Sequence, residues 1–287
     1  MHPDLPARAV HFLSLHVPGD PLVLLNAWDP GTARLFQGLG AKAVGTTSMG
    51  ISAAEGFPEG QVTPWSRMHY RIASIAAAVT VPVTADIESG YADKPEGVAA
   101  NVTSLVNDSV VGINIEDSAQ GPGSPLLEPE ILIDRIRAAR AVSEALGIHL
   151  VINARPDTFL AGGAPPAELL REAIVRGNRY RDAGADCIFV PGARDPDHIE
   201  TLVREIDAPI NIVANPAIGA DVPTIPHLAD LGVARVSVGS ALMRASLAFT
   251  ARAATEILSR GAYDTAAEEL HHPDAPASYR MAIGENA

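Results

Sequence analysis

Short apolar runs alternate with longer amphipathic runs along most of the chain. Eight of the short runs have the length and composition of β-strands, at residues 22–28, 43–47, 81–88, 112–116, 149–155, 187–191, 209–215 and 235–239. Between them lie helical patterns, the clearest at 65–79, 95–107, 128–146, 166–183 and 196–205. Prolines in the first turn of several helical runs, and Gly147 and Gly184 after two of them, indicate where helices begin and end.

This alternation predicts a parallel sheet, because each helical crossover returns the chain to the same edge of the sheet. Apolar runs such as LVLL at 22–25 and PINIVA at 209–214 also fit strands covered on both faces. Eight such units without a G-x-G-x-x-G fingerprint favour an α/β fold of the (β/α)8 TIM-barrel type over a doubly wound sheet. We expect one barrel domain at 1–260. The tail at 261–287 is either a loose end or an arm that docks on a neighbouring subunit.

Composition and charge narrow the function. The 287 residues include 34 acidic and 21 basic side chains, and the formal charge of −13 disfavours binding to nucleic acid or to anionic membrane surfaces. An anionic small substrate is compatible with this charge, since a metal and an arginine can reverse the potential inside a cleft. Cys187 is the only cysteine, which rules out an intrachain disulfide and predicts a cytoplasmic location. We expect no signal peptide and no membrane span, because no stretch reaches ~20 apolar residues.

Acidic residues stand at the carboxyl ends of the third and fourth predicted strands. Asp86 and Glu88 end the run VPVTADIE, and residues at i and i+2 of a strand lie on one face, so the two carboxylates could bind one cation. Glu116, with Asp117 beside it, ends the run GINIE. Parallel barrel strands all point to one mouth, where we expect these acids to meet. Two solvated acids at a strand end are the alternative interpretation of Asp86 and Glu88.

A bound cation explains such a cluster, because unpaired carboxylates packed together raise one another's pKa. Oxygen ligands without a His or Cys cluster predict Mg²⁺ or Mn²⁺. Arg155, at the end of the fifth strand, suits a substrate carboxylate, and its alternative is an internal ion pair with one of the acids. The loop that starts at Thr47 and includes Ser48 could present backbone N–H groups to an anion. Trp28 is expected to line the pocket, or else to belong to the core.

Five motifs in this order, NAWD, TTSMG, ADIESGY, GINIED and NAR, resemble the isocitrate lyase and phosphoenolpyruvate mutase superfamily over about residues 22–260. The resemblance implies a (β/α)8 barrel with a C-terminal helical extension swapped between the subunits of a homo-oligomer, a dimer or tetramer. It also implies a Mg²⁺ site that Asp86 contacts directly, Glu88 and Glu116 hold largely through water, and Glu59 supplements. For the substrate, the implied contacts are Trp28, Ser48, Met49, Gly50, Asp86, Arg155 and Asn215.

The stretch 117–130, DSAQGPGSPLLEPE, has the length and Gly and Pro content of a lid, although a surface loop without a role is the alternative. The lyases carry a Lys-Lys/Arg-Cys-Gly-His motif there, whereas this chain has Gln120-Gly-Pro-Gly-Ser124. The chain is thus methylisocitrate lyase-like but lacks the lid cysteine. The catalytic candidates are Arg155, Glu116 and Ser124, and the proton that quenches the intermediate is expected from Ser124, Tyr91 or a metal-bound water.

We therefore expect a Mg²⁺-dependent carbon–carbon lyase acting on a small 2-oxo or hydroxy carboxylate. It would cleave an oxo- or hydroxy-dicarboxylate through a pyruvate-type enolate, as isocitrate lyases and oxaloacetate decarboxylases do. Two alternatives stay open: a mutase or hydrolase that acts on the P–C bond of a phosphonate, and a non-catalytic protein that binds a 2-oxo acid.

Overall fold

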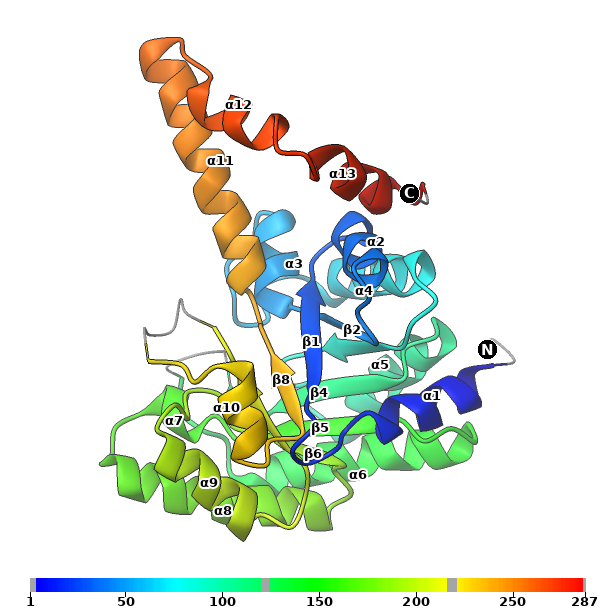
Figure 1. Cartoon of the computed structure of the whole chain (residues 1–287). Helices are drawn as coiled ribbons and strands as arrows, with labels where there is room; N and C mark the ends of the chain where they lie inside the picture. Colours follow the sequence, from blue (N-terminus) through cyan, green and yellow to red (C-terminus); the bar gives the residue numbers. More distant parts are fainter. Residues whose placement is uncertain (1–3, 120–123, 216–220, 286–287) are drawn as a thin grey trace.

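A computed structural model of the chain describes residues 4–119, 124–215 and 221–285, and its centre is a closed barrel of parallel strands (Figure 1). The strands are β1 (Leu22–Ala27), β2 (Val44–Thr46), β3 (Val83–Asp86), β4 (Gly112–Glu116), β5 (Val151–Arg155), β6 (Cys187–Phe189), β7 (Ile210–Val213) and β8 (Arg235–Ser237). They pair in chain order, and β8 closes the barrel on β1. The predicted (β/α)8 fold is confirmed, and each strand lies within its predicted range.

Helices surround the barrel and extend beyond it. They are α1 (Leu5–Ser14), α2 (Pro30–Gly38), α3 (Ser48–Ala54), α4 (Trp65–Ala78), α5 (Pro95–Asn107), α6 (Pro129–Ala145), α7 (Thr158–Ala161), α8 (Pro166–Asp182), α9 (Pro196–Glu205), α10 (Ile225–Asp230), α11 (Ala241–Arg260), α12 (Asp264–Leu270) and α13 (Ala275–Ile283). Proline opens α5, α6, α8 and α9, as the sequence predicts, because its fixed φ suits the first turn.

The expected loop at the start of α3 is in fact helical. Thr47 caps α3, since its hydroxyl accepts the Gly50 N–H at 3.3 Å. Gly50 also packs closely on β1: a Cβ at this glycine would lie 3.0 Å from the Cβ of Trp28. The small residues that suggested a loop therefore serve close packing of a short helix.

The amino end of the barrel is filled by α1. Phe12 is fully buried, and a Cβ at Gly112 of β4 would lie 2.7 Å from its ring, so β4 needs glycine at this point. Beside Phe12 lies the buried Arg235 of β8, with its guanidinium carbon 6.0 Å from the ring centre. Phe12 and Arg235 thus fill this end of the barrel, and the sites of such barrels lie at the opposite, carboxyl end.

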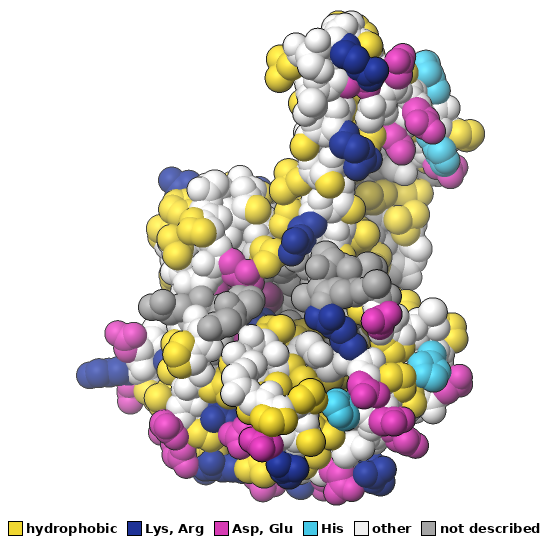
Figure 2. All heavy atoms as spheres, turned by 90° about the vertical axis from the view of Figure 1, so that its left-hand side faces the viewer, with side chains coloured by type: hydrophobic (Ala, Val, Ile, Leu, Met, Phe, Trp, Pro, Cys, Tyr) yellow, Lys and Arg dark blue, Asp and Glu magenta, His cyan; other side chains and the backbone are white. Residues whose placement is uncertain are grey.

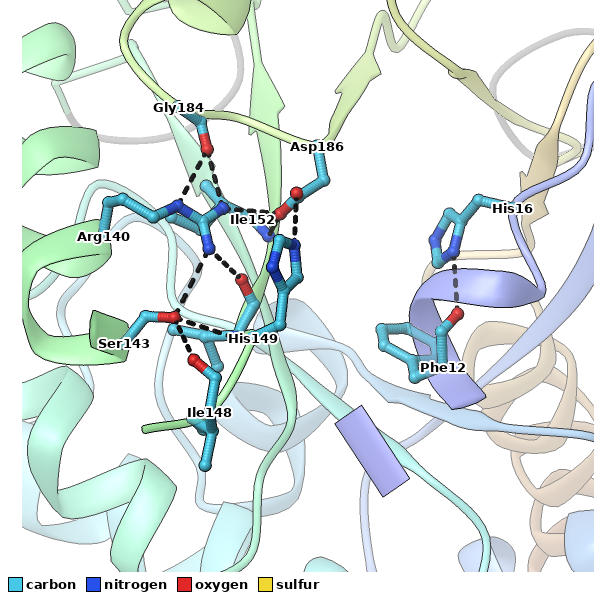
Figure 3. A network of polar contacts seen from close by, with 10 residues as sticks. Phe12, His16, Arg140, Ser143, Ile148, His149, Ile152, Gly184 and Asp186 are labelled. Atoms are coloured by element: carbon cyan, nitrogen blue, oxygen red, sulfur yellow. Dashed lines mark hydrogen bonds and ion pairs between the residues drawn. The ribbon is translucent and has the colours of Figure 1, made fainter. Parts of the chain in front are cut away.

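A polar network ties β5 and β6 together at the same amino end. Figure 3 shows Arg140 and His149 pointing toward Asp186, which accepts hydrogen bonds from the Arg140 guanidinium and the Ile152 N–H at 2.7 and 2.8 Å. His149 Nε2 lies 2.7 Å from the other Asp186 oxygen. Nearby, the His16 ring donates to the Phe12 carbonyl at 3.0 Å. These contacts hold strand ends far from the mouth and indicate a structural role.

After β8 the chain leaves the barrel along α11, which projects away from the body before α12 and α13 fold back (Figure 1). α13 packs on α2 of the same chain, where the Arg34 guanidinium donates to the Ile283 carbonyl at 3.3 Å. Hydrophobic side chains are exposed among charged ones along α11, α12 and α13 (Figure 2), and Leu258 of α11 and Leu270 of α12 are 87% and 74% exposed. The expected tail is thus helical, whereas its exchange between subunits stays a prediction. Among the described residues, no helix has both the length and the apolar character needed to cross a membrane.

Candidate active site

Asp86, the last residue of β3, is held by only one of its two carboxylate oxygens. Oδ2 accepts hydrogen bonds from the Ser48 N–H at 3.1 Å and the Ser48 hydroxyl at 2.8 Å. The Asp86 N–H donates to the Thr46 hydroxyl at 2.9 Å, which fixes the backbone. Oδ1 is buried, and no described residue provides it with a hydrogen bond. A buried carboxylate oxygen without a partner is costly, so Oδ1 is suited to contact a cation.

Glu88 reaches the same region by a route that the sequence did not predict. β3 ends at Asp86, and Glu88 has a φ of +49°, so the expectation that both acids lie on one strand face is wrong. The left-handed turn is held by two contacts: the Gln61 N–H donates to Glu88 Oε2 at 2.7 Å, and the Tyr91 hydroxyl donates to Oε1. Both carboxylate oxygens of Glu88 are therefore already hydrogen-bonded, and its side chain is almost fully buried.

Arg155, at the end of β5, lies between two carboxylates. Its Nη1 is 2.6 Å from Glu116 Oε2, and its Nε and Nη2 donate to the two oxygens of Asp157 at 2.6 and 2.7 Å. The internal ion pair that the sequence left open is thus present. Asp157 was missed by the sequence analysis, and its position two residues after Arg155 was the available signal. The remaining Glu116 oxygen accepts from the Ser118 hydroxyl at 2.7 Å.

Asp117 points away from this group, so its expected place beside the other acids is wrong. Its Oδ2 accepts from Arg176 at 3.0 Å and from the Tyr180 hydroxyl at 2.6 Å, both on α8. Its Oδ1 accepts from the Asp157 N–H at 2.8 Å. Adjacent residues at a strand end face opposite sides, so Glu116 turns inward and Asp117 turns toward the surrounding helices.

Burial and mutual repulsion raise the pKa values of the acids at the mouth. Burial raises the pKa of Glu59 to about 7 against the pull of Arg155, and the charges of Asp86 and Glu88 add to the rise. Burial is also the main cause of the raised pKa of Glu88 and of Glu116, where Arg155 opposes it. Four acids, Glu59, Asp86, Glu88 and Glu116, thus act on one another around a single guanidinium that Asp157 already engages. A bound cation would relieve this repulsion.

The donor set fits Mg²⁺ better than a metal that needs many protein ligands. Among residues 4–119, 124–215 and 221–285, no three His, Cys, Asp or Glu side chains come together closely enough to ligate one ion. Mg²⁺ usually keeps several waters and binds proteins through one or two carboxylates. Asp86, with its unpartnered Oδ1, fits the role of such a direct ligand, and the other acids fit contacts through water.

The expected substrate contacts are only partly brought together. Two of the backbone N–H groups expected to face an anion already make hydrogen bonds: the Ser48 N–H donates to the Asp86 carboxylate and the Gly50 N–H donates to the Thr47 hydroxyl. Trp28 is half-buried against Gly50. Asn215 is buried beyond β7, with its amide nitrogen 3.8 Å from the place of a Cβ on Gly239.

The expected lid is described only in part. Residues 120–123 lie outside the described residues, so the structure does not place Gln120 and its neighbours. Ser124 is half-buried and makes no hydrogen bond with the acids in the described part of the chain. The catalytic role expected for Ser124 therefore stays a prediction.

Comparison with known proteins identifies relatives of this site and fold. A family model described as phosphoenolpyruvate phosphomutase matches residues 12–258. An uncharacterized protein of Mycobacterium tuberculosis, Rv1998c, is 38% identical over 86% of this chain and 88% of its own length. An oxaloacetate decarboxylase of Pseudomonas entomophila is 31% identical over 78% of this chain and 76% of its own.

A crystal structure from Burkholderia cenocepacia, provisionally described as a lyase/mutase, is 34% identical and superposes with a TM-score of 0.87 over 99% of this chain and 98% of its own. The family match covers the whole barrel, and the same superfamily was indicated by the motifs around Asp86 and Arg155. The chain therefore belongs to the phosphoenolpyruvate phosphomutase family, within the PEP mutase/isocitrate lyase superfamily.

Proposed function

We propose that the chain is a Mg²⁺-dependent lyase that cleaves a C–C bond of an oxo- or hydroxy-dicarboxylate and forms or consumes a pyruvate-type enolate. The observation that carries the proposal is the buried Asp86 Oδ1 without a partner, next to an excess of carboxylates around Arg155. Asp86 would hold the ion directly, with Glu88, Glu116 and Glu59 supporting it through water. When bound, Mg²⁺ supplies a Lewis acid that polarises the carbonyl and carboxylate oxygens of a 2-oxo acid.

Arg155 supplies the fixed positive charge of the site. Its Nε and Nη2 donate hydrogen bonds to Asp157 and its Nη1 forms an ion pair with Glu116, and we propose that its other N–H groups bind a substrate carboxylate or an enolate oxygen. Because Nε and Nη2 both donate to Asp157, the guanidinium is oriented before the substrate binds. Such pre-organisation lowers the barrier to forming a negatively charged oxygen.

Proton supply limits which bond the site can break. Decarboxylation of a 2-oxo dicarboxylate such as oxaloacetate breaks the C3–C4 bond and leaves its electron pair in the enolate, which needs a proton at C3 only after CO₂ has left. An aldol-type cleavage also needs a base for the hydroxyl proton. The stretch 117–130 contains no thiol, amine or imidazole, and burial keeps the Tyr91 phenol neutral by raising its pKa. Tyr91 and Ser124 are the proton donors we propose, and this short supply favours a decarboxylation-type reaction.

The arm supports a proposal about assembly. The outward side chains of β1, Val23 and Leu25, are only half-buried and line a cavity of about 350 Å³, because α11 projects away from the barrel instead of covering them. Leu258 on α11 and Leu270 on α12 are also exposed, and together these surfaces support a homo-oligomer in which the C-terminal residues 261–287 are exchanged.

A substrate panel tests the proposed reaction. Purified protein with Mg²⁺ is incubated with oxaloacetate, methylisocitrate, isocitrate and phosphonopyruvate, and the release of pyruvate, glyoxylate and phosphate is followed. We expect pyruvate from oxaloacetate or a related dicarboxylate, and none when Mg²⁺ is chelated. Release of phosphate alone would refute C–C cleavage and favour P–C chemistry. Binding of oxo acids without any product would make the protein a sensor rather than an enzyme.

A further inference from the structure

Arg135, on α6, is a buried arginine without a carboxylate partner. The residue is 6% exposed, and its only hydrogen bond within the described part of the chain is from Nη2 to the Ala92 carbonyl at 3.2 Å. Its Nε and Nη1 are buried and donate to no described residue. The contrast with Arg155 and Arg176 is sharp, since carboxylate oxygens lie within 2.6 to 3.0 Å of both.

A buried guanidinium with unused donors is costly unless something else binds it. Asp93 is the acid whose charge acts on Arg135, but no hydrogen bond joins the two in the described structure. The side chain does not fill the barrel core either, because it lines a cavity at the surface of the barrel. The unsatisfied donors therefore point to a ligand rather than to a structural ion pair.

The cavity has a volume of about 450 Å³ and lies between the turn after β3 and helix α6. Its polar lining is formed by Gln61, Ser89, Tyr91, Asp93 and Arg135. This volume is within the range of small-molecule sites, which is about 300–1,000 Å³.

We propose that this cavity is a binding site for a small carboxylate anion, held by the guanidinium of Arg135. A carboxylate matches the planar donors of arginine and carries the single charge that one guanidinium can balance. A phosphate is less suited, because its second negative charge would meet only Asp93.

Gln61 and Tyr91 lie between the proposed anion site and the acidic cluster and contact both. Gln61 and Tyr91 line the cavity and also donate the two hydrogen bonds that hold Glu88. Gln61 is itself fixed from the cavity side, since its amide donates to the Ser89 hydroxyl at 2.6 Å and accepts the Tyr91 N–H at 2.8 Å. An anion in the cavity can thus influence Glu88 through Gln61 or Tyr91, and the carboxylate is either a free molecule or the far end of a substrate bound at the mouth.

Calorimetric titration of acetate, which carries a single negative charge, into the full-length protein with Mg²⁺ chelated tests the site apart from the proposed function. We expect saturable binding by the wild type, and a loss of at least about tenfold in affinity in Arg135→Met, as for removal of a charged hydrogen-bond partner. Arg137→Met is the matched control, because Arg137 lies on the same helix with its side chain 66% exposed. Its affinity should equal that of the wild type.

Asp86→Ala separates the two sources of the carboxylate. Binding that survives Asp86→Ala but not Arg135→Met supports a site for a free carboxylate, whereas loss in both variants supports the far end of a substrate. Unchanged binding in Arg135→Met, or no saturable binding by the wild type, would overturn the proposal. If Arg135→Met does not fold, a crystal of the wild type grown with acetate decides: we expect its carboxylate within hydrogen-bonding distance of Nε or Nη1, and its absence refutes the site.

Discussion

Replacing Asp86 by Asn is the most direct test of the proposed metal site. Asparagine has nearly the same shape, and its side-chain oxygen can still accept the two hydrogen bonds from Ser48 that Oδ2 accepts now. The amide nitrogen would then take the place of the unpartnered Oδ1. This exchange puts an N–H donor where the cation should sit and removes the negative charge, while the local structure is kept.

The expected effect can be worked out as a change in thermal stability. Mg²⁺ at about 100 times its Kd stabilises the native state by about 2.7 kcal/mol. For 287 residues, an unfolding entropy of about 2.1 cal/mol/K per residue amounts to about 0.6 kcal/mol/K, so Mg²⁺ should raise Tm by about 4 °C. Mutation of residues that only hydrogen-bond to a metal ligand already weakens metal binding by about 10- to 100-fold. A loss of about 100-fold leaves about 0.4 kcal/mol, and the rise falls below about 1 °C.

The assay is differential scanning fluorimetry at fixed Mg²⁺, with a chelated sample of each variant as its own reference. Asp117→Asn is the control, because Asp117 follows the acidic strand end yet bonds to Arg176 and Tyr180 instead. That variant should melt earlier but keep the full rise in Tm on addition of Mg²⁺. A full rise in Asp86→Asn, or its loss in Asp117→Asn, would refute the assignment of Asp86 as the direct ligand.

Three further outcomes are expected. Tyr91→Phe removes the hydroxyl that donates to Glu88, and should weaken Mg²⁺ binding by roughly tenfold in the same assay; unchanged Mg²⁺ binding would contradict a supporting role for Glu88. Burial lowers the pKa of His16 from 6.5 to about 4, so the unfolded chain binds more protons in this window and stability is lost as pH falls from 6.5 to 4. Between pH 6.5 and pH 4, the free energy of unfolding of His16→Gln in urea should therefore fall by about 3 kcal/mol less than that of the wild type. If the free energy of unfolding fell equally with pH in both proteins, His16 would not be buried in the neutral form. Deletion of residues 261–287 should lower the oligomer mass in light scattering, and an unchanged mass would contradict arm exchange.

The strands were predictable because most of their residues are buried, so each strand is a short run rich in apolar residues between longer amphipathic runs. The run PINIVA at 209–214, for example, contains the whole of β7 and can be recognised as a strand without knowledge of its neighbours. α3 was not predictable, because Ser, Gly and Ala have no apolar period, and its helix depends on the cap at Thr47 and on contact with Trp28. The path of the arm after α11 was not predictable either, since its docking depends on surfaces distant in sequence.

In the candidate site, the sequence predicted that Asp86, Glu88 and Glu116 come near one another, but for a partly wrong reason. A period of two placed Asp86 and Glu88 on one face, but Glu88 is held in a left-handed turn by Gln61 and Tyr91. Gln61 is 27 residues away from Glu88 in the chain, so no local pattern could reveal this contact. Asp157 is a different case, because it lies only two residues after Arg155 and this spacing could have revealed the contact.

Hydrogen-bond satisfaction differs among the buried charges of this chain. Asp117 is fully buried, yet both of its oxygens are occupied, by Arg176, Tyr180 and the backbone of Asp157, so nothing further is needed at that position. Asp86 and Arg135 are each held at one atom and left without a partner at others in the described structure. Folding alone would favour filling such positions with paired or apolar groups. Arg235 also has Nε and Nη1 without a partner in the described structure, but it lies beside Phe12 at the amino end of the barrel. Asp86 lies in the acidic cluster and Arg135 lines a cavity, so for these two residues we propose ligands of opposite charge: a divalent cation at Asp86 and a carboxylate at Arg135.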